Sequence, residues 1–142
     1  MRLPSLLLAL LLTACTSAPL PPPKDDSLYR GLGELPGITR IVEGMLLNAA
    51  RNPRITHHFD DIDIERLRDK LVEQICVEAG GPCEYTGDSM EESHKGLNID
   101  RGDFNALVED LIDAMEAEGV AVPVQNRLLA RLAPMREQII ER

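Results

Sequence analysis

The chain has 142 residues and a formal net charge of −9, a length that suits one domain. Nucleic-acid binding needs clustered Lys and Arg, so this acidic composition argues against a nucleic-acid partner. Trp is absent and aromatic residues make up only 3%, so a core must be built from aliphatic side chains.

The first 14 residues have the features of a secretory signal peptide. Arg2 supplies the positive start, and residues 6–12 form an apolar run that is too short to span a membrane stably. The run leads into Leu12-Thr13-Ala14-Cys15, which resembles a bacterial lipobox. This resemblance implies cleavage before Cys15 and lipidation of that residue. Ordinary signal cleavage near this point is the alternative.

The residues after Cys15 predict which membrane holds the anchor and that an extended linker follows it. Thr16 stands where an Asp would retain a lipoprotein in the inner membrane, so we predict a lipid anchor in the outer membrane, facing the periplasm. Residues 15–27 are rich in Pro and predict an extended linker without a packed core. The folded domain is then predicted to span residues 28–142.

Residues 28–142 show helical and no strand-like periodicity, so we predict an all-α domain. Gly and Pro interrupt residues 28–37, which should form a short helix and a turn. Apolar residues recur at helical spacing over 38–49, and Asn52-Pro53 ends that helix. Residues 54–59 are then expected to form a short helical corner.

Three further helices follow in the pattern. An apolar stripe runs along residues 64–79, with Asp63 as the expected N-cap. Asp100 should begin the next helix, which Gly119 ends. Pro123 suits the first position of the last helix, and Pro134 should kink it.

Between the second and third predicted long helices lies the most informative stretch. Gly80-Gly81-Pro82 stops a helix, because glycine and proline both disfavour its continuation. Met90 and His94 are four residues apart, so one helical turn puts them on the same face. Imidazole is a common metal ligand, but a lone histidine specifies no metal. Taken alone, His94 reads more simply as a surface or capping histidine.

The order of residues in this stretch changes that interpretation. The run GGPxxYTGxxMxxxHxGLxI over residues 80–99 resembles the proximal half of a group I truncated (2-on-2) haemoglobin. The resemblance extends over roughly residues 28–140. It implies a truncated globin fold, haem b as cofactor and His94 as the ligand of haem iron. Glu34 departs from the family, which usually carries a Gly pair near Gly33.

The same resemblance implies roles for the pocket residues. Phe59 matches the phenylalanine that globins stack on the haem, and residues 64–79 match the distal helix. Many relatives place a tyrosine and glutamines at the distal positions that bond a gas ligand. Leucines stand at all three positions here, so the pocket should be apolar and should lack these donors: Leu46, Leu67 and Leu71. The remaining expected haem contacts are Met90, Ile99 and Phe104.

The propionates of a haem call for cationic or hydroxyl donors. Lys70 matches a position where the family often has a basic residue, and Tyr85 is a second candidate. Arg68 and Lys95 are also close in sequence, but we favour ordinary surface charge for both.

Other polar residues near the pocket admit two interpretations. Gln74 follows Leu71 by about one turn and is expected at a solvated helix edge, with an inward orientation as the alternative. His57 and His58 flank Phe59 and are expected as a surface corner pair, with coordination of iron as the alternative.

Cys76 and Cys83 are the thiols that remain after Cys15. In an oxidising compartment they would form a disulfide that pins the distal helix to the segment carrying His94. Free cysteines packed as small hydrophobic residues are an equal alternative. A zinc site built from these cysteines and the histidine pair is disfavoured, because close ligand pairs are missing.

The leading functional hypothesis is a lipid-anchored haem protein that binds O₂, NO or CO outside the cytoplasm, and we favour gas binding over catalysis. An enzymatic alternative is NO dioxygenase-type detoxification, which needs polarised O₂ and an electron-donating reductase. The three leucines argue against the first requirement, and the sequence identifies no reductase. A third hypothesis is a haem-free globin-fold lipoprotein that acts through protein contacts; the presence of both Phe59 and His94 argues against it.

Overall fold

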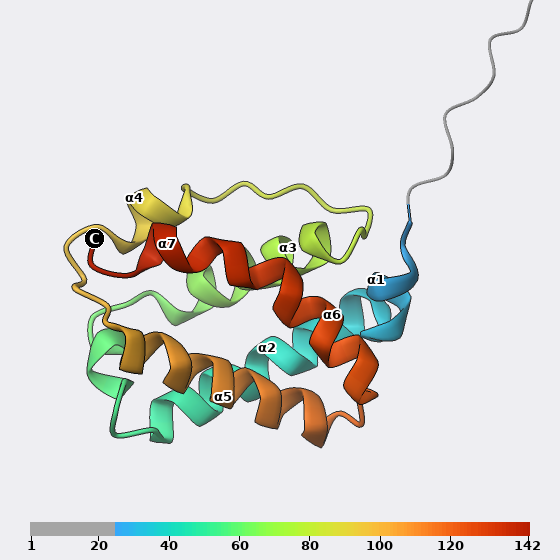
Figure 1. Cartoon of the computed structure of the whole chain (residues 1–142), viewed down its shortest axis with the longest axis horizontal. Helices are drawn as coiled ribbons and strands as arrows, with labels where there is room; N and C mark the ends of the chain where they lie inside the picture. The colour runs from blue at the N-terminus through green and yellow to red at the C-terminus, as the bar shows by residue number, and fades with distance from the viewer. Residues whose placement is uncertain (1–24) are drawn as a thin grey trace, which may run out of the picture.

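The computed structural model describes residues 25–142. The predicted signal peptide, Cys15 and nearly all of the linker lie outside the described residues. Within residues 25–142 the regular structure is helical, as predicted. Figure 1 shows the order of the helices: α1 (Ser27–Gly31), α2 (Glu34–Arg51), η1 (Thr56–Phe59), α3 (Ile64–Glu78), α4 (Met90–His94), α5 (Arg101–Ala117), α6 (Val122–Leu132), η2 (Ala133–Met135) and α7 (Arg136–Ile139).

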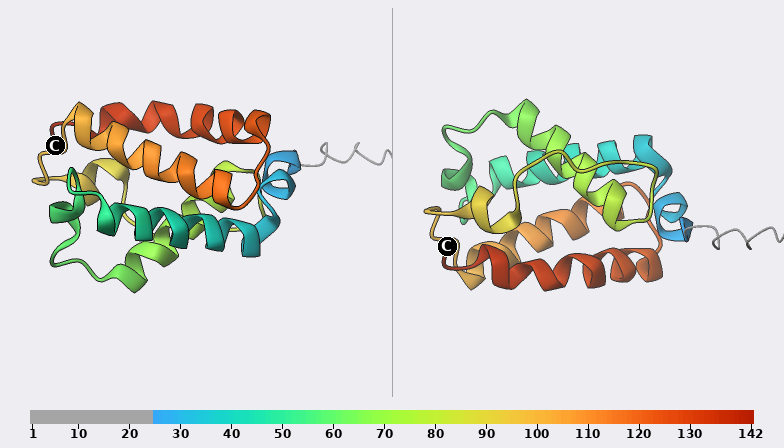
Figure 2. Two further views of the ribbon diagram at one scale, coloured as in Figure 1. Left: turned by 90° about the horizontal axis from the view of Figure 1, so that it is seen from below. Right: turned by 90° about the horizontal axis from the view of Figure 1, so that it is seen from above.

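The long helices form two pairs around a central apolar region. α2 contacts both α3 and α5, while α3 also contacts α6. Figure 2 shows α2 beside α3 on one side of the domain, with α6 and α7 on the other, and α5 crosses α2 in close contact. This is the all-helical, 2-on-2 arrangement that the sequence predicts.

α2 begins four residues earlier than the apolar pattern indicates. Gly33 has a φ of 83°, in the left-handed region that glycine adopts readily, and it turns the chain from α1 into α2. Pro36 lies in the first turn of α2, where its missing N–H removes no intrahelical hydrogen bond. The proline is therefore part of the helix and does not precede it.

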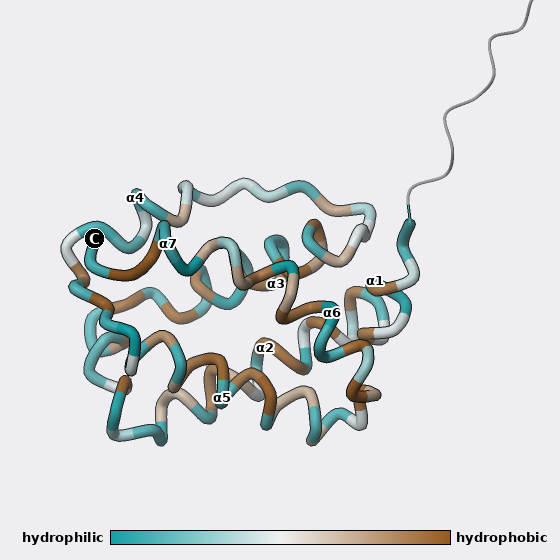
Figure 3. Tube along the Cα trace, in the orientation of Figure 1, coloured by the Kyte–Doolittle hydropathy of each residue, from teal (hydrophilic) through white to brown (hydrophobic). Residues whose placement is uncertain are grey.

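The core is aliphatic and centres on α2 and α5. A Cβ atom added to Gly44 of α2 would lie 3.2 Å from the Cβ of Ala114, so the two helices approach closely at this crossing. Figure 3 shows hydrophobic residues recurring along both helices, with hydrophilic residues between them. No helix among residues 25–142 is both long enough and apolar enough to span a membrane. The almost completely buried side chains include Ile38, Ile41, Val42, Ile55, Met115 and Leu128.

The predicted N-caps of α3 and α5 are confirmed, but the predicted burial of one apolar residue of α3 is wrong. The Asp63 carboxylate accepts the backbone N–H of Arg66 at 3.0 Å and so caps α3. Asp100 and Asp103 cap α5 reciprocally, each accepting the backbone N–H of the other. Ile64 was expected on the buried stripe of α3, but it is 47% exposed because it occupies the first position of the helix, outside the core.

The last predicted helix is divided in three. Pro134 stands in the 3-10 turn η2 between α6 and α7, so the chain is interrupted there and does not continue as one kinked helix. Pro123 occupies the second position of α6, one residue later than predicted, and again lies in a first turn. The interruption brings the short α7 against α4.

Candidate functional site

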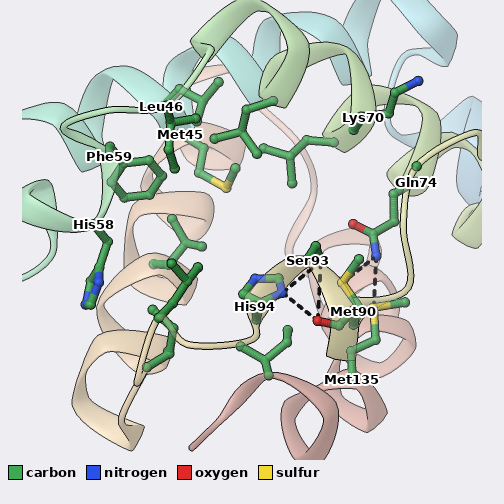
Figure 4. Close-up of a pocket in the computed structure, with 18 of the residues that line it drawn as sticks. Met45, Leu46, His58, Phe59, Lys70, Gln74, Met90, Ser93, His94 and Met135 are labelled. Carbon is green, nitrogen blue, oxygen red and sulfur yellow. Dashed lines mark hydrogen bonds between the residues drawn. The ribbon is translucent and has the colours of Figure 1, made fainter. Parts of the chain in front are cut away.

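A cavity of about 480 Å³ lies between the two helix pairs. One wall comes from α2, η1 and α3, and the opposite wall comes from α4, α5, η2 and α7 (Figure 4). Most of the lining is aliphatic or aromatic. The lining contains ten of the residues singled out in the sequence: Leu46, Phe59, Leu67, Lys70, Leu71, Tyr85, Met90, His94, Ile99 and Phe104.

His94 ends α4 and is half-buried at the cavity wall. Its Nδ1 lies 2.8 Å from the backbone carbonyl oxygen of Met90 and 3.0 Å from Oγ of Ser93. A carbonyl oxygen can only accept, so Nδ1 of the neutral ring carries the proton. Nε2 is then left with its lone pair, and Figure 4 shows the ring directed into the cavity. This is the tautomer that a metal-binding histidine requires.

The wall that faces His94 is apolar. Leu46 of α2 is 8% exposed, and Leu67 and Leu71 of α3 are half-buried against the same core. Phe59 closes the corner beside them, and the sulfur of Met45 points into the space above His94 (Figure 4). None of the three leucines can donate a hydrogen bond.

A disulfide joins Cys76, at the C-terminal end of α3, to Cys83 in the segment that leads to α4. Of the two alternatives left open by the sequence, the structure therefore has the bridged one. Gly81 fits inside this short loop because a Cβ there would collide with Sγ of Cys76 and with the ring of Tyr29. The bridge holds the approach to α4 against α3.

A second link between α3 and the same segment is polar. The Nζ of Lys70 donates to Glu73 Oε1 at 2.9 Å and to the hydroxyl of Thr86, while the backbone N–H of Thr86 donates to Glu73 at 2.9 Å. These donors, the Thr86 N–H first and Lys70 next, lower the pKa of Glu73 to about 2. Lys70 thus lies at the cavity edge already paired with Glu73.

Gln74 is turned inward, so its expected place at a solvated helix edge is wrong. Its amide nitrogen donates to Sδ of Met90 and to Sδ of Met135, each at 3.2 Å (Figure 4). Thioether sulfur is a weak acceptor, so these two bonds position the amide more than they stabilise the fold. In the sequence, the only indication of this inward orientation is that Gln74 follows Leu71 by about one helical turn.

His58 is half-buried and does not behave as a surface residue. Its Nε2 lies 3.2 Å from Asp103 Oδ2 but is not aligned for a hydrogen bond. Its ring centroid lies 4.0 Å from that of the exposed His57, with the two rings tilted by 39°. Figure 4 shows the His58 ring turned away from the space above His94. The pKa of Asp103 is lowered mainly by the Asp100 backbone N–H, with His58 contributing less.

The remaining polar candidates divide between the rim and the surface. Tyr85 lines the cavity and donates its hydroxyl to the carbonyl of Asp88 at 2.7 Å, and burial raises its pKa. Arg68 pairs with Asp69 at 2.8 Å and does not line the cavity, and Lys95 is exposed outside it. Arg66 does line the cavity, although sequence reasoning overlooked it because it lies off the apolar stripe of α3.

Two layers of helices around an apolar cavity, with a single imidazole directed into it, define the globin class of haem-pocket folds. The chain belongs to the bacterial-like globin family, whose model matches residues 27–141. That match covers the whole described domain apart from its terminal residues.

Curated relatives and solved structures agree with this assignment. The chain is 28% identical over 113 residues to the group 1 truncated hemoglobin GlbN of Mycolicibacterium paratuberculosis, covering 80% of this chain and 83% of the relative. It is also 28% identical to GlbN of Nostoc sp., covering 82% of this chain and 99% of the relative. The crystal structure of the Tetrahymena pyriformis truncated hemoglobin in its Fe(III) form superposes with a TM-score of 0.79 at 24% identity, covering 81% of this chain and 98% of that chain.

Proposed function

We propose that this protein binds haem b through His94 and takes up a diatomic gas (O₂, NO or CO) at the haem iron. The observation that carries the proposal is the His94 tautomer: its Nδ1 donates to Met90, which leaves Nε2 free to bind a metal. The cavity volume of about 480 Å³ and its apolar walls suit a flat, largely apolar group. Haem would supply the redox-active iron at which a gas can bind.

The residues of the chain would then divide the remaining tasks. Phe59, Ile99 and Phe104 offer apolar contacts to the ring, while Met90 forms part of the wall beside His94. Arg66 stands at the cavity edge with donors that suit the propionates, and Tyr85 lies there too but would have to exchange its bond with the Asp88 carbonyl. Lys70 would have to exchange its bond with Glu73 for a propionate, so we assign it a smaller share of that binding.

The apolar wall should set the gas preference. Bound O₂ carries partial negative charge and is held by a hydrogen-bond donor, whereas CO and NO depend less on one. Leu46, Leu67 and Leu71 supply none. We therefore expect fast O₂ release and weak discrimination against CO and NO. The same absence weighs against NO dioxygenase chemistry, which needs polarised O₂.

The spectrum of the purified protein tests the central proposal. Reconstitution with haem should give a Soret band that depends on His94 and disappears in His94→Ala. The matched control is His57→Ala, because His57 is an exposed histidine outside the cavity. A wild-type protein that takes up no haem, or a Soret band of equal strength in His94→Ala, would overturn the proposal.

We further propose that Cys15 is lipidated and that the protein faces the periplasm from the outer membrane. The lipobox-like sequence before Cys15 and the disulfide between Cys76 and Cys83 both support export to an oxidising compartment. Metabolic labelling with a radioactive fatty acid should mark the wild-type chain and not Cys15→Ser. Labelling of both chains, or of neither, would contradict the anchor.

A further inference from the structure

We propose that the thioether sulfur of Met45 is the sixth ligand of the haem iron when no gas is present. The inference rests on the proposed binding of haem through His94. An axial pair must approach iron from opposite faces, and Met45 and His94 come from opposite walls of the cavity (Figure 4). Met45 is on α2 and only 3% exposed, so its side chain has no place outside this cavity and the adjoining core.

Several other cavity residues with lone pairs are already engaged or face elsewhere. The amide N–H groups of Gln74 donate to the sulfurs of Met90 and Met135, so one lone pair of each sulfur is already taken. Lys70 is held by Glu73 and Thr86, and the His58 ring lies beside Asp103. Among the described residues, Met45 Sδ receives no hydrogen bond, so its lone pairs stay available in the space above His94.

Chemistry favours this atom over a polar ligand in such a wall. A thioether is neutral, so it coordinates iron without placing a charge among leucines. Methionine has an unbranched side chain with three rotatable bonds, which lets its sulfur move over the short span that coordination needs. Histidine–methionine ligation is an established haem arrangement, and it raises the reduction potential relative to other axial pairs.

The consequence is that gas uptake becomes a ligand exchange. In the haem-loaded protein a gas would have to displace the Met45 thioether, an exchange in which nothing is oxidised or reduced. If Met45 occupies the iron in nine-tenths of the molecules, the apparent gas affinity is about tenfold below the intrinsic value.

Spectroscopy of the haem-loaded full chain tests this assignment. The ferric wild-type protein should be low-spin and show the weak sulfur-to-iron charge-transfer band at the red end of the visible spectrum. Met45→Leu, a substitution of similar volume, should lose that band and become high-spin or water-ligated. It should also bind CO about tenfold more tightly. Met135→Leu is the matched control and should keep the band, because the Met135 sulfur already accepts a hydrogen bond from Gln74.

The outcomes separate this inference from the proposed function. A Soret band that depends on His94 without a sulfur band in the wild type overturns the role of Met45 and leaves haem binding intact. A sulfur band that persists in Met45→Leu also overturns it, whether or not the band disappears in Met135→Leu. Failure to bind any haem removes both proposals. Because the wild-type spectrum is itself decisive, a poorly folding Met45→Leu would not leave the question open.

Discussion

The Nδ1–H of His94 donates to the backbone carbonyl of Met90, four residues earlier on the same short helix, over 2.8 Å. The acceptor is main chain, so no side-chain substitution on α4 removes it while the helical turn persists. The tautomer of His94 is therefore fixed by the helix that carries it. The tautomer of His94 therefore depends on where α4 lies and only weakly on which other side chains α4 carries.

Deleting the His94 side chain should leave a hole that free imidazole can fill. We expect His94→Gly to lose the Soret band and to regain it on addition of imidazole, since the cavity walls remain in place. Absorption titrations measure both effects. His57→Gly serves as the control and should need no imidazole, because His57 lies outside the cavity. A His94→Gly protein that binds haem without imidazole would contradict this prediction.

Glu73 should make the stability of the domain depend on pH in the acid range. Its folded pKa is about 2, against an ordinary value of 4.5, because Thr86 and Lys70 donate to the carboxylate. A lowered folded pKa stabilises the native state above pH 4.5, and this contribution is lost as pH falls from there towards about 2.

The matched measurement is the midpoint of thermal unfolding across that pH range. Glu73→Gln should be less stable than wild type at neutral pH, and its midpoint should fall less steeply on acidification. Glu65→Gln changes an exposed glutamate of the same helix that makes no hydrogen bond among the described residues, and its profile should follow wild type. Parallel profiles for Glu73→Gln and wild type would refute the assignment.

Removal of the disulfide should cost stability. Cys76 and Cys83 are 7 residues apart, so the bridge closes a short loop in the unfolded chain. The loop-entropy model gives about 2–3 kcal/mol for a loop of this size. Chemical denaturation should show that loss when a reductant is added. The Cys76→Ser/Cys83→Ser double variant should start at the lower stability and show no response to reductant.

A donor introduced into the apolar wall should slow O₂ release. Leu71→Gln places an amide at a half-buried position of the cavity wall with little change in size. A hydrogen bond to a charged group is worth ~1.5–3 kcal/mol. At about 1.4 kcal/mol per factor of ten, O₂ dissociation should slow roughly ten- to a hundredfold.

Stopped-flow measurement of O₂ and CO release checks that expectation, with CO release changing much less. Leu47→Gln makes the same substitution on α2 at a leucine that is 57% exposed and outside the cavity, so both rates should stay at the wild-type values. Equal slowing of O₂ and CO in Leu71→Gln would indicate a steric effect and would count against the donor explanation.

Local signals in the sequence were enough to predict the long helices and two of their N-caps, whereas the residues expected at the cavity came from the resemblance to truncated haemoglobins. Asp63 and Asp100 cap their helices as predicted, because a capping residue acts on donors two or three positions away. Likewise, the spacing of Met90 and His94 places both on one turn of α4, as observed. When the interacting residues lie within one helical turn of each other, the residue pattern is enough to predict their contact.

The misplaced residues depend on partners far away in sequence. Gln74 turns inward because its amide donates to Met135, 61 residues later in the chain, and no local sequence pattern indicates that contact. The loop after His94 is likewise held by the other end of the domain, since the N–H of Gly96 donates to the carbonyl of Arg142 at 2.9 Å. Such contacts follow from tertiary packing and cannot be predicted from the periodicity of apolar residues.

α4 itself has five residues and buries none of them, so it owes its position to neighbours on both sides. An isolated helix of that length is not stable in water. Its opening should therefore require much less free energy than unfolding of the α2–α5 core. We expect the amides of residues 90–94 to exchange with deuterium well before those of α2. Haem would then enter and leave through a brief excursion of this one turn, while the rest of the domain stays folded.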